Sequence, residues 1–578
     1  MAVPNANNPR VAFRGVRPMQ DGKNATAAPR PAKVEPVGVD RLAKRVGATL
    51  RQASSAADEP VISALAALDQ PMVTGASLRA QQVYPGDLFA ALPGAKAHGA
   101  DFVDQALRAG AAAVLTDSVG ANRPALRDVP VPLLVHDEPK AVLGELAAMI
   151  YGDPSRHLAV LGITGTSGKT TTSYLVQAGL EAAGRTTGLI GTVETRVAGN
   201  RLASAFTTPE APDLQALFGY MREEGVTEVA MEVSSHALAL GRVAGTSFAV
   251  GAFTNLSRDH LDFHADMADY FAAKAKLFDG RSAIEVVCVD GDWGRRLVTP
   301  NTITVSVAGS AGDGGSSSAG GSASWTADEL TVDADGGQSF VARGPEGQRI
   351  DIALKLPGAF NVANALVAVA ILRARDVPPD AIATGLADVD VPGRMERLAL
   401  GQDYTAIVDY SHKPEAVAKA LDAVRAQQRR AGNDDGRVIV VLGCGGDRDA
   451  AKRPMMGDAA ARRADLLIVT DDNPRSEDPG EIRAAMLAGA LAVPAVQRGK
   501  VIDIGDRRAA IEQAVHAARS GDVIVVAGKG HETGQEIDGV VHPFSDRDEL
   551  EAAIRAELNE TTGQLPSFSE PRSVRQGR

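Results

Sequence analysis

A glycine-rich segment followed by a lysine and two threonines is the strongest chemical signal in the sequence. Residues 164–171 read Thr-Gly-Thr-Ser-Gly-Lys-Thr-Thr, directly after the apolar stretch Leu158 to Ile163. Glycines let backbone N–H groups close around a phosphate, and a helix N-terminus adds a favourable dipole. Ile163 stands where the strict phosphate-loop pattern has glycine, but Gly-Lys-Thr-Thr after a strand favours the loop over an ordinary turn. We expect Lys169 to reach the β- and γ-phosphates of a nucleotide and the Thr170 hydroxyl to bind magnesium.

A carboxylate at a predicted strand end is the second signal. Val229 to Val233 reads as a strand, and Glu232 is placed to hold magnesium beside a phosphate loop. His260 and His264 have the i,i+4 spacing of two zinc ligands on a helix. A zinc protease needs Glu directly after its first His, and Leu261 stands there instead. We therefore reject zinc protease chemistry.

The elements that must position these residues alternate between strand and helix along the chain. Apolar strand candidates recur from Leu158 to Val289 and again from Ala406 to Val526, with helical stretches between them. Such alternation predicts an α/β fold with mostly parallel sheets, and the 578 residues exceed one hydrophobic core, so we expect three domains.

The predicted domains are a small N-terminal α/β domain, a central mostly parallel sheet that carries the phosphate loop, and a C-terminal Rossmann-like, doubly wound sheet. The predicted boundaries are 1–59 for a disordered extension, 60–156, 157–390 and 391–558 for the domains, 308–324 for a flexible Gly/Ser insertion, and 559–578 for a disordered tail.

Composition excludes several classes of protein. A net charge of -12 argues against general nucleic-acid binding, although Met1 to Lys33 alone carries a net charge of +5. No apolar run approaches the roughly 20 residues of a membrane helix, and the N-terminus lacks the apolar core of a signal peptide. Cys288 and Cys444 lie in or beside apolar strands, so we expect buried free thiols in a reducing cytoplasm.

The segment Gly165 to Thr170 resembles the nucleotide loop of the Mur ligases, Gly-Thr-x-Gly-Lys-Thr, and further motifs follow in that family's order from about residue 70 to 550. The resemblance implies three domains, with uridine-nucleotide binding in the first and ATP as a cosubstrate in the second. Residues 360–364, 393–397 and 408–412 resemble the family's asparagine pair near adenine, its hinge and its nucleotide-orienting aspartate. The implied ATP-binding residues are Thr164, Gly165, Thr166, Ser167, Gly168, Lys169, Thr170, Asn361, Arg394 and Asp409.

The resemblance also implies the metal and catalytic residues. In Mur ligases the matching Glu and His are magnesium ligands, which implies that role for Glu232 and His260 beside Thr170. Tyr-Phe-Ala-Ala-Lys at 270–274 resembles the segment with the family's lysine carbamylated by CO2, so Lys274 is the expected carbamate and a further metal ligand. The residues alone favour an exposed lysine on an amphipathic helix, and Lys276 is a nearby competitor. The expected catalytic residues are Lys169, Lys274, His260 and Glu232.

Contacts to a UDP-muramoyl-dipeptide are implied by matches to the family's third enzyme. Arg242 can pair bidentately with a pyrophosphate or carboxylate. Phe206 and Leu240 stand where some relatives have Asn and Gln, and residues 76–79 read Ala-Ser-Leu-Arg in place of Ser-Asp-Ser-Arg. The implied substrate-binding residues are Thr207, Thr208, Ser234, Arg242 and Leu78.

The choice of amino acid is implied by polar residues after predicted C-terminal strands. Asp-Asn-Pro-Arg at 472–475 is the family signature associated with meso-diaminopimelate. A zwitterionic side-chain end needs cations for its carboxylate and acceptors for its ammonium, and arginines and acids occur together here. An isolated quartet is ordinarily a turn, but Gly-Lys-Gly-His-Glu at 528–532 accompanies this one. The implied diaminopimelate-binding residues are Arg448, Asp472, Asn473, Pro474, Arg475, Gly528 and Glu532.

The resemblance therefore implies an ATP-dependent ligase of peptidoglycan precursor synthesis. We expect it to add meso-2,6-diaminopimelate to UDP-N-acetylmuramoyl-L-alanyl-D-glutamate through an acyl phosphate. Its partners would be these small molecules with Mg2+, and we expect a cytoplasmic monomer. The alternatives are a ligase that adds L-lysine, a folate polyglutamylation relative, and a nucleotide-binding regulatory protein whose ligase site has decayed.

Overall fold

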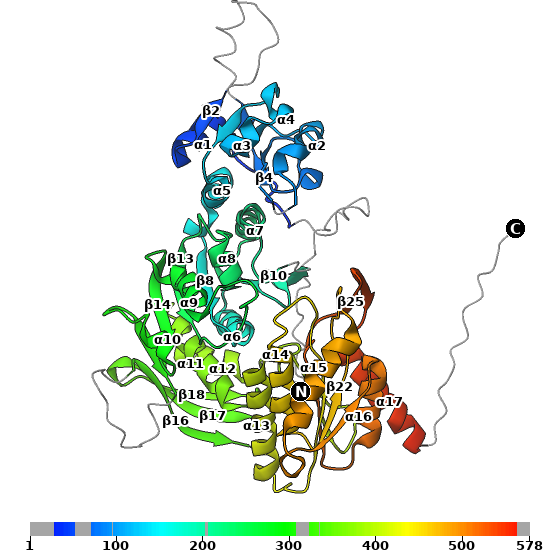
Figure 1. The fold of residues 1–578 in the computed structure, drawn as a ribbon. Coiled ribbons are helices and arrows are strands. Elements are labelled where there is room, and N and C mark those ends of the chain that lie inside the picture. Colours follow the sequence, from blue (N-terminus) through cyan, green and yellow to red (C-terminus); the bar gives the residue numbers. More distant parts are fainter. Residues whose placement is uncertain are drawn as a thin grey trace, which may run out of the picture.

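The computed structural model describes residues 28–51, 71–94, 96–202, 206–307, 323–333 and 336–562. Figure 1 shows a small N-terminal domain at one end of a larger central domain, with the C-terminal domain beside the central one. Among the described residues no helix is long and apolar enough to cross a membrane. Cys288 and Cys444 are buried free thiols, which confirms the prediction.

The N-terminal domain is a sheet covered by short helices. Its elements are β1 (Val37–Gly38), α1 (Val39–Val46), β2 (Thr49–Arg51), β3 (Met72–Val73), β4 (Gly75–Ser77), β5 (Asp87–Ala90), α2 (Val103–Arg108), β6 (Ala113–Thr116), α3 (Ser118–Ala121), α4 (Pro124–Arg127), β7 (Leu133–Val135) and α5 (Pro139–Ile150). The strand order is β2-β7-β6-β5-β4, with β4 to β7 parallel. Side chains alternate along β5, so Leu88 packs in the core with α1 and α5 while Phe89 packs with α2 and α4.

The central domain is built on one long sheet. Its elements are β8 (Ala159–Thr164), α6 (Lys169–Ala182), β9 (Thr187–Ile190), β10 (Thr195–Val197), β11 (Asn200–Leu202), α7 (Ala211–Glu223), β12 (Glu228–Glu232), α8 (Ser235–Ala239), β13 (Phe248–Phe253), α9 (Met267–Ala275), β14 (Ser282–Cys288), α10 (Asp292–Arg295), β15 (Ile303–Ser306), β16 (Trp325–Val332), β17 (Gln338–Arg343), β18 (Arg349–Leu354), α11 (Ala359–Ala374) and α12 (Pro379–Ala387). The order is β11-β10-β9-β12-β8-β13-β14-β15-β16-β17-β18, and β9 to β16 run parallel through its middle. The carboxyl ends of β12, β8 and β13 therefore meet at one edge of the sheet.

The C-terminal domain is a doubly wound sheet. Its elements are β19 (Glu396–Leu398), β20 (Thr405–Asp409), α13 (Pro414–Arg430), β21 (Val438–Leu442), α14 (Lys452–Ala461), β22 (Leu466–Val469), α15 (Pro479–Ala492), β23 (Lys500–Asp503), α16 (Arg507–Ala517), β24 (Val523–Ala527), β25 (Gly534–Ile537), β26 (Val540–Pro543) and α17 (Asp546–Thr562). The order is β19-β20-β24-β21-β22-β23, with β19 antiparallel to the rest. Along β21, Val440 faces the core with α13 to α15 and Val441 faces the core with α16 and α17. Apolar residues on both faces explain the near-continuous hydrophobic strands of this half.

The predicted disordered extension 1–59 is wrong for residues 28–51. Helix α1 buries Val39, Leu42 and Ala43, an i, i+3, i+4 pattern, and ends at Gly47, which has a φ of 69°. Arg30 pairs with Asp87, with 2.7 Å between Nη1 and Oδ1. This apolar stripe is short and follows a basic, proline-containing segment. The composition of that segment is typical of disorder, and the prediction followed the composition rather than the stripe. Residues 1–27 and 52–59 lie outside the described residues.

N-terminal residues 28–36, here called the strap, join two domains. The amides of Ala32 and Lys33 donate to the Glu223 carboxylate on α7, at 2.7 and 3.0 Å. Arg30 of the same segment holds Asp87 of the N-terminal domain. The strap therefore ties the N-terminal sheet to a helix of the central domain.

Two other predicted segments fall partly outside the described residues. The Gly/Ser insertion 308–324 connects β15 to β16, and its residues 308–322 are not among those described. The predicted tail 559–578 starts a few residues too early, because α17 continues to Thr562. Residues 563–578 lie outside the described part of the chain.

Candidate active site

The phosphate loop connects β8 to α6 at the edge where the parallel strands end. Gly168 has a φ of 89°, and a Cβ there would collide with the Asn364 carboxamide, so only glycine fits. The loop is held from outside by the chain that follows β13. Thr166 Oγ1 accepts from the Ser257 amide at 3.0 Å, and the Ser167 amide donates to Asn255 Oδ1 at 3.1 Å. Thr164 is fully buried at the end of β8, where the loop begins.

Lysine side chains from separate elements converge on the loop carbonyls. Lys169 Nζ donates to Gly165 O at 2.9 Å, and Lys274 Nζ donates to the same oxygen at 2.9 Å. Lys413, from the C-terminal domain, donates to Thr166 O at 3.1 Å. Each of these lysines is partly or wholly buried, so their charges repel one another with little screening.

The pKa values of the two central-domain lysines respond to this crowding. Burial and the charge of Lys413 lower the pKa of Lys169 to about 8. Burial, Lys169 and Lys413 lower the pKa of Lys274 well below its ordinary value. Lys274 is 1% exposed, so it is not the exposed helical lysine that the residues alone favoured. Lys276, the competitor, is exposed.

An acid and a histidine lie beside the lysines. Asp259 Oδ2 is 2.8 Å from Lys413 Nζ and 3.1 Å from His260 Nε2. Burial by itself raises the pKa of Asp259, but the charges of Lys413 and His260 outweigh it and keep the pKa below its ordinary value. Burial lowers the pKa of His260 to about 3, so its imidazole is neutral and able to bind a metal.

The other histidine of the i,i+4 pair is engaged on both ring nitrogens. His264 Nε2 lies 3.0 Å from Ser235 Oγ, and its Nδ1 lies 3.3 Å from Asp269 Oδ2. His260 has a φ of 54° and so does not sit on a helix. These contacts agree with the rejection of a helical zinc pair.

Glu232, a predicted metal ligand, contacts residues of the predicted dipeptide site. Its carboxylate accepts from the Thr192 amide at 2.8 Å and from the Thr192 hydroxyl at 3.0 Å. Thr207 Oγ1 is 3.0 Å from Thr192 Oγ1, and Thr208 Oγ1 donates to Glu232 O at 2.8 Å. The structure thus brings Thr207 and Thr208 against the strand end that carries Glu232.

Arg242 and Ser234 complete that cluster. The Ser234 amide donates to Thr208 Oγ1 at 3.1 Å, and its own hydroxyl caps α8. Arg242 Nη1 donates to Thr208 O at 3.2 Å, and Nη2 is 2.7 Å from Glu210 Oε1. Its guanidinium also lies 5.2 Å from the centroid of the Phe206 ring, so the residue that replaces the expected Asn packs against this cation.

Leu78 is placed apart from that cluster. It follows β4 and packs against the N-terminal core with α1 and α5. The neighbouring Arg79 reaches Asp213 on α7, at 3.9 Å between Nη1 and Oδ2. Leu78 therefore lies at the face of the N-terminal domain that meets the central domain, and no described contact joins it to the threonines.

Two residues that are predicted to bind ATP come from the later part of the chain. One of them contacts the residue that follows Lys169 of the phosphate loop, and the other holds the first in place. Arg394 Nη2 donates to Thr170 Oγ1 at 3.1 Å, and its guanidinium lies 4.1 Å from the Tyr410 ring centroid. Asp409 accepts from the amides of Met395 and Ser411, at 2.8 and 2.9 Å, so it fixes the turn that carries Arg394.

The predicted asparagine pair sits at the start of α11. Asn361 donates to Pro357 O at 2.8 Å and accepts from Asn364 Nδ2 at 3.0 Å. Asn364, in turn, is the residue that a Cβ on Gly168 would strike. Asn361 therefore reaches the phosphate loop through Asn364.

Gly393 sets the path of the predicted hinge. It has a φ of 65°, and a Cβ on it would strike the backbone of Gly530 and His531. The hinge turn therefore packs directly against the Gly-Lys-Gly-His-Glu segment.

Most residues predicted to bind the amino acid meet at the carboxyl ends of the C-terminal strands. Asn473 Nδ2 donates to Glu532 Oε2 at 2.9 Å, and Lys529 Nζ donates to Asn473 Oδ1 at 3.0 Å. Lys529 Nζ is also 3.8 Å from Asp472 Oδ1. Burial and then the charge of Asp472 raise the pKa of Glu532. Gly528 lies under Asp472, which a Cβ at that position would strike.

The two arginines predicted at this site differ in their surroundings. Arg475 Nη1 donates to Gly446 O at 2.7 Å, and its Nε is 3.1 Å from Glu536 Oε2. Pro474, before it, packs its carbonyl on Gly446. Arg448 is exposed and donates to Asp447 O at 3.0 Å. Arg475 is thus fixed in place, whereas Arg448 is tied only to its own loop.

Sequence reasoning missed Lys413, Thr192 and Lys529 as parts of this site. Lys413 and Lys529 follow β20 and β24 within a few residues, and strand ends of a doubly wound sheet are where ligands bind. That rule could have marked both lysines. Thr192 follows the short strand β9 and carries no comparable signal.

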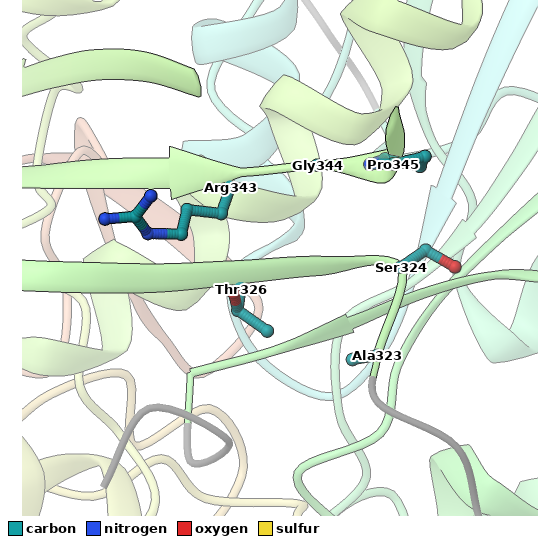
Figure 2. A pocket seen from close by; sticks show the side chains of 6 residues that line it. All are labelled: Ala323, Ser324, Thr326, Arg343, Gly344 and Pro345. Atoms are coloured by element: carbon teal, nitrogen blue, oxygen red, sulfur yellow. The ribbon is translucent and has the colours of Figure 1, made fainter. Parts of the chain in front are cut away.

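A separate hollow lies away from these residues. Figure 2 shows it between β16 and the end of β17. None of the predicted site residues is among the residues that line it. Its lining residues are Ala323, Ser324, Thr326, Arg343, Gly344 and Pro345.

Family models match three parts of the chain. The Mur ligase family catalytic domain matches residues 72–151, the Mur ligase middle domain matches 163–372, and the Mur ligase glutamate ligase domain matches 393–530. The chain is 50% identical to the UDP-N-acetylmuramoyl-L-alanyl-D-glutamate--2,6-diaminopimelate ligase of Streptomyces coelicolor, over 91% of this chain and 98% of that protein.

Two further comparisons agree with that match. The chain is 52% identical to the protein of the same name from Corynebacterium efficiens, over 81% of this chain and 87% of the relative. A solved structure of a UDP-N-acetylmuramoyl-L-alanyl-D-glutamate--2,6-diaminopimelate ligase has a TM-score of 0.59 and 28% identity, and covers 91% of this chain and 100% of its own.

Proposed function

The chain belongs to the Mur ligase family, and we propose that within it the chain adds meso-2,6-diaminopimelate to UDP-N-acetylmuramoyl-L-alanyl-D-glutamate at the expense of ATP. The reaction is a step of peptidoglycan precursor synthesis. The observation that carries the proposal is the acceptor site, where Asn473, Glu532 and Arg475 present acceptors and a cation together at the strand ends. The side-chain end of diaminopimelate carries both an ammonium and a carboxylate, so it needs hydrogen-bond acceptors as well as a cation. Because the reaction consumes ATP and a nucleotide-linked substrate, we place it in the cytoplasm.

The chemistry divides between two sets of residues. The first is the phosphate loop with the lysines around it, here called the phosphate cleft, and the second is the acceptor site. The dipeptide carboxylate attacks the γ-phosphorus of ATP, and the bond to ADP breaks, which leaves an acyl phosphate. Lys169 and Lys413 lie where they can neutralise charge on the transferring phosphoryl group. The diaminopimelate amine then attacks the acyl carbon, loses a proton, and displaces inorganic phosphate. Arg242, beside Thr208, is the cation placed to hold the dipeptide.

The residues present fit magnesium. Among the described residues no group of three or more His, Cys, Asp or Glu side chains could hold a metal by itself. Magnesium suits such a site, because it is usually bound by one or two carboxylates together with substrate phosphates and water. Glu232, neutral His260 and the Thr170 hydroxyl are the protein groups that would hold it. When bound, the metal supplies positive charge to the phosphate oxygens.

Lys274 fits a carbamate for electrostatic reasons. A neutral amine is the form that attacks CO2, and burial lowers the pKa of Lys274 far enough to supply that form. The new N–C bond and the loss of one proton from the nitrogen turn this neutral amine into a carbamate anion. That anion would lie among the charges of Lys169 and Lys413, where repulsion is otherwise strong.

The test is phosphate release by the purified chain with ATP, magnesium and the UDP-muramoyl-dipeptide, with meso-diaminopimelate or L-lysine offered in parallel. We expect turnover with diaminopimelate and little with lysine. Turnover with lysine alone would keep the ligase and refute the acceptor. No phosphate release with either amino acid would refute the ligase activity and favour a regulatory protein.

A further inference from the structure

A small hairpin lies against the residues that the proposed function assigns to the acceptor. Strands β25 and β26 form a two-stranded sheet of their own, and this hairpin stands at the edge of the C-terminal domain in Figure 1. It follows directly after Glu532. A single parallel bridge joins Arg475 to Ile537 at the end of β25. The hairpin therefore continues from the acceptor site and folds back onto it.

The hairpin fixes the first half of the segment Asp472 to Arg475. Gln535 Nε2 donates to Asp472 O at 2.8 Å, and the Glu536 amide donates to Asn473 Oδ1 at 3.0 Å. With Lys529 on the same Asn473 oxygen, the carboxamide is held so that its amino group points to Glu532. The orientation of Asn473 thus depends on a backbone amide of the hairpin.

The second half of the segment is held through Arg475. Its amide donates to Glu536 O at 3.0 Å, and its carbonyl accepts from the Asp538 amide at 2.8 Å. These bonds fix a backbone with a φ of 53°, which an arginine adopts only when its surroundings impose it.

The guanidinium of Arg475 is oriented by a side chain of the hairpin. Glu536 takes Nε at 3.1 Å and Gly446 O takes Nη1 at 2.7 Å. Among the described residues no hydrogen-bond partner contacts Nη2, so the N–H groups of this nitrogen remain for a ligand carboxylate. The side chains of Arg475 and Glu536 are 21% and 40% exposed, and an ion pair this accessible adds little stability.

We infer that Glu536 is a positioning residue that aims Arg475 at the carboxylate of the acceptor side chain and so helps to select diaminopimelate over lysine. The inference rests on the proposed function. Glu536 acts only through Arg475 and touches no reacting atom. Lysine has no carboxylate at the end of its side chain, so a correctly oriented Arg475 strengthens the binding of diaminopimelate alone. Losing that orientation should therefore weaken the binding of diaminopimelate and leave the binding of lysine unchanged.

The experiment compares Glu536→Ala, Glu536→Gln and Asp538→Asn in the full chain. Asp538→Asn is the matched control, because it also removes one negative charge from the hairpin but keeps the backbone bond to Arg475. Asparagine also tolerates the φ of 49° at that position. For each variant we would measure kcat, the KM for diaminopimelate, ATP and UDP-muramoyl-dipeptide, and turnover with lysine.

We expect Glu536→Ala to raise the KM for diaminopimelate about tenfold, the loss typical of a charged hydrogen bond. The KM for ATP, the KM for the dipeptide and the slow lysine reaction should stay within about twofold, because Arg475 serves neither nucleotide nor lysine. Glu536→Gln, which keeps an oxygen for Nε, should recover part of the loss, and Asp538→Asn should match the wild type.

An unchanged KM for diaminopimelate in Glu536→Ala would overturn the inference, and so would an equal rise in all three KM values, which marks a structural role. If Glu536→Ala fails to fold, the near-isosteric Glu536→Gln decides the question. The comparison is again between the change in the KM for diaminopimelate and the changes in the KM for ATP and for the dipeptide. A wild-type chain that does not turn over diaminopimelate would instead refute the proposed function, a result visible before any variant is compared.

Discussion

The phosphate cleft and the acceptor site balance charge in opposite ways. Around the phosphate loop, Lys169, Lys274 and Lys413 donate to backbone carbonyls, and Asp259 is the acid that pairs with one of them. At the acceptor site, by contrast, Lys529 and Arg475 are each paired with a carboxylate.

The difference reflects the ligands that each region is suited to bind. Lysines bonded only to carbonyls have not found their strongest partners, so a polyanion gains by replacing those carbonyls. A site whose charges are already paired offers no such excess, and instead holds each charged group in a fixed position to which a zwitterion must fit. The phosphate cleft is thus suited to bind ligands with a large negative charge, and the acceptor site is suited to a ligand whose charged groups have the right positions.

The largest expected effect is in the phosphate cleft. Lys169→Ala should lower kcat by about 10³-fold, because it removes a cation from the transferring phosphoryl group. The measurement is phosphate release with all substrates, and the exposed Lys276→Ala is the control. Turnover within about threefold of the wild type would remove Lys169 from the mechanism.

A second effect separates cation from carbamate within the same cleft. Lys274→Ala should lower kcat by about 10²-fold. The wild type assayed in CO2-free buffer should also lose activity and regain it when bicarbonate is added, whereas the variant should not respond. A wild type that is indifferent to bicarbonate would refute the carbamate and leave Lys274 as a buried amine.

A third, smaller effect tests whether the C-terminal domain contributes to the cleft. Lys413→Met should lower kcat by roughly 10- to 100-fold and leave the KM for diaminopimelate nearly unchanged, because Lys413 contacts the phosphate loop and Asp259. Lys419→Met on α13, the helix that begins directly after Lys413, is the control, since the Lys419 side chain is 60% exposed. A selective rise in the KM for diaminopimelate would erase the distinction between the two regions.

The last prediction is a pH dependence confined to the acceptor site, and it concerns the KM for diaminopimelate and leaves the phosphate-loop residues untouched. Burial and Asp472 raise the pKa of Glu532, so its carboxylate takes up a proton at a higher pH than an ordinary Glu. An ammonium ligand favours the ionised form, so the KM for diaminopimelate should rise as pH falls from about 7 to 5, by at most about tenfold per unit. Glu532→Gln should flatten this dependence, and a parallel rise in the KM for ATP would contradict it.

Many residues of the two regions could be predicted from the sequence, because they directly follow apolar strands. The phosphate loop and the Asp472 to Arg475 segment each follow an apolar strand, and the rule that ligands bind at carboxyl ends placed both. The structure also shows Asp472, Asn473 and Glu532 together, as the demand for ammonium acceptors predicted.

The remaining features depend on contacts between distant parts of the chain. Lys413 matters because it meets Thr166, 247 positions earlier, and no local pattern announces that meeting. Leu78 was predicted by alignment with a motif that this chain alters, and it packs into the N-terminal core. Helix α1 was missed because its short apolar stripe follows a segment with a disorder-like composition.

The strap has a consequence for the order in which the molecule assembles. Its amide at Ala32 donates to Glu223, a residue 191 positions further along the chain. At about 5–20 residues per second, the strap leaves the ribosome on the order of ten seconds or more before α7 emerges. The N-terminal domain can fold in that interval, but its orientation on the central domain is fixed only afterwards, when Glu223 meets a segment that was made much earlier.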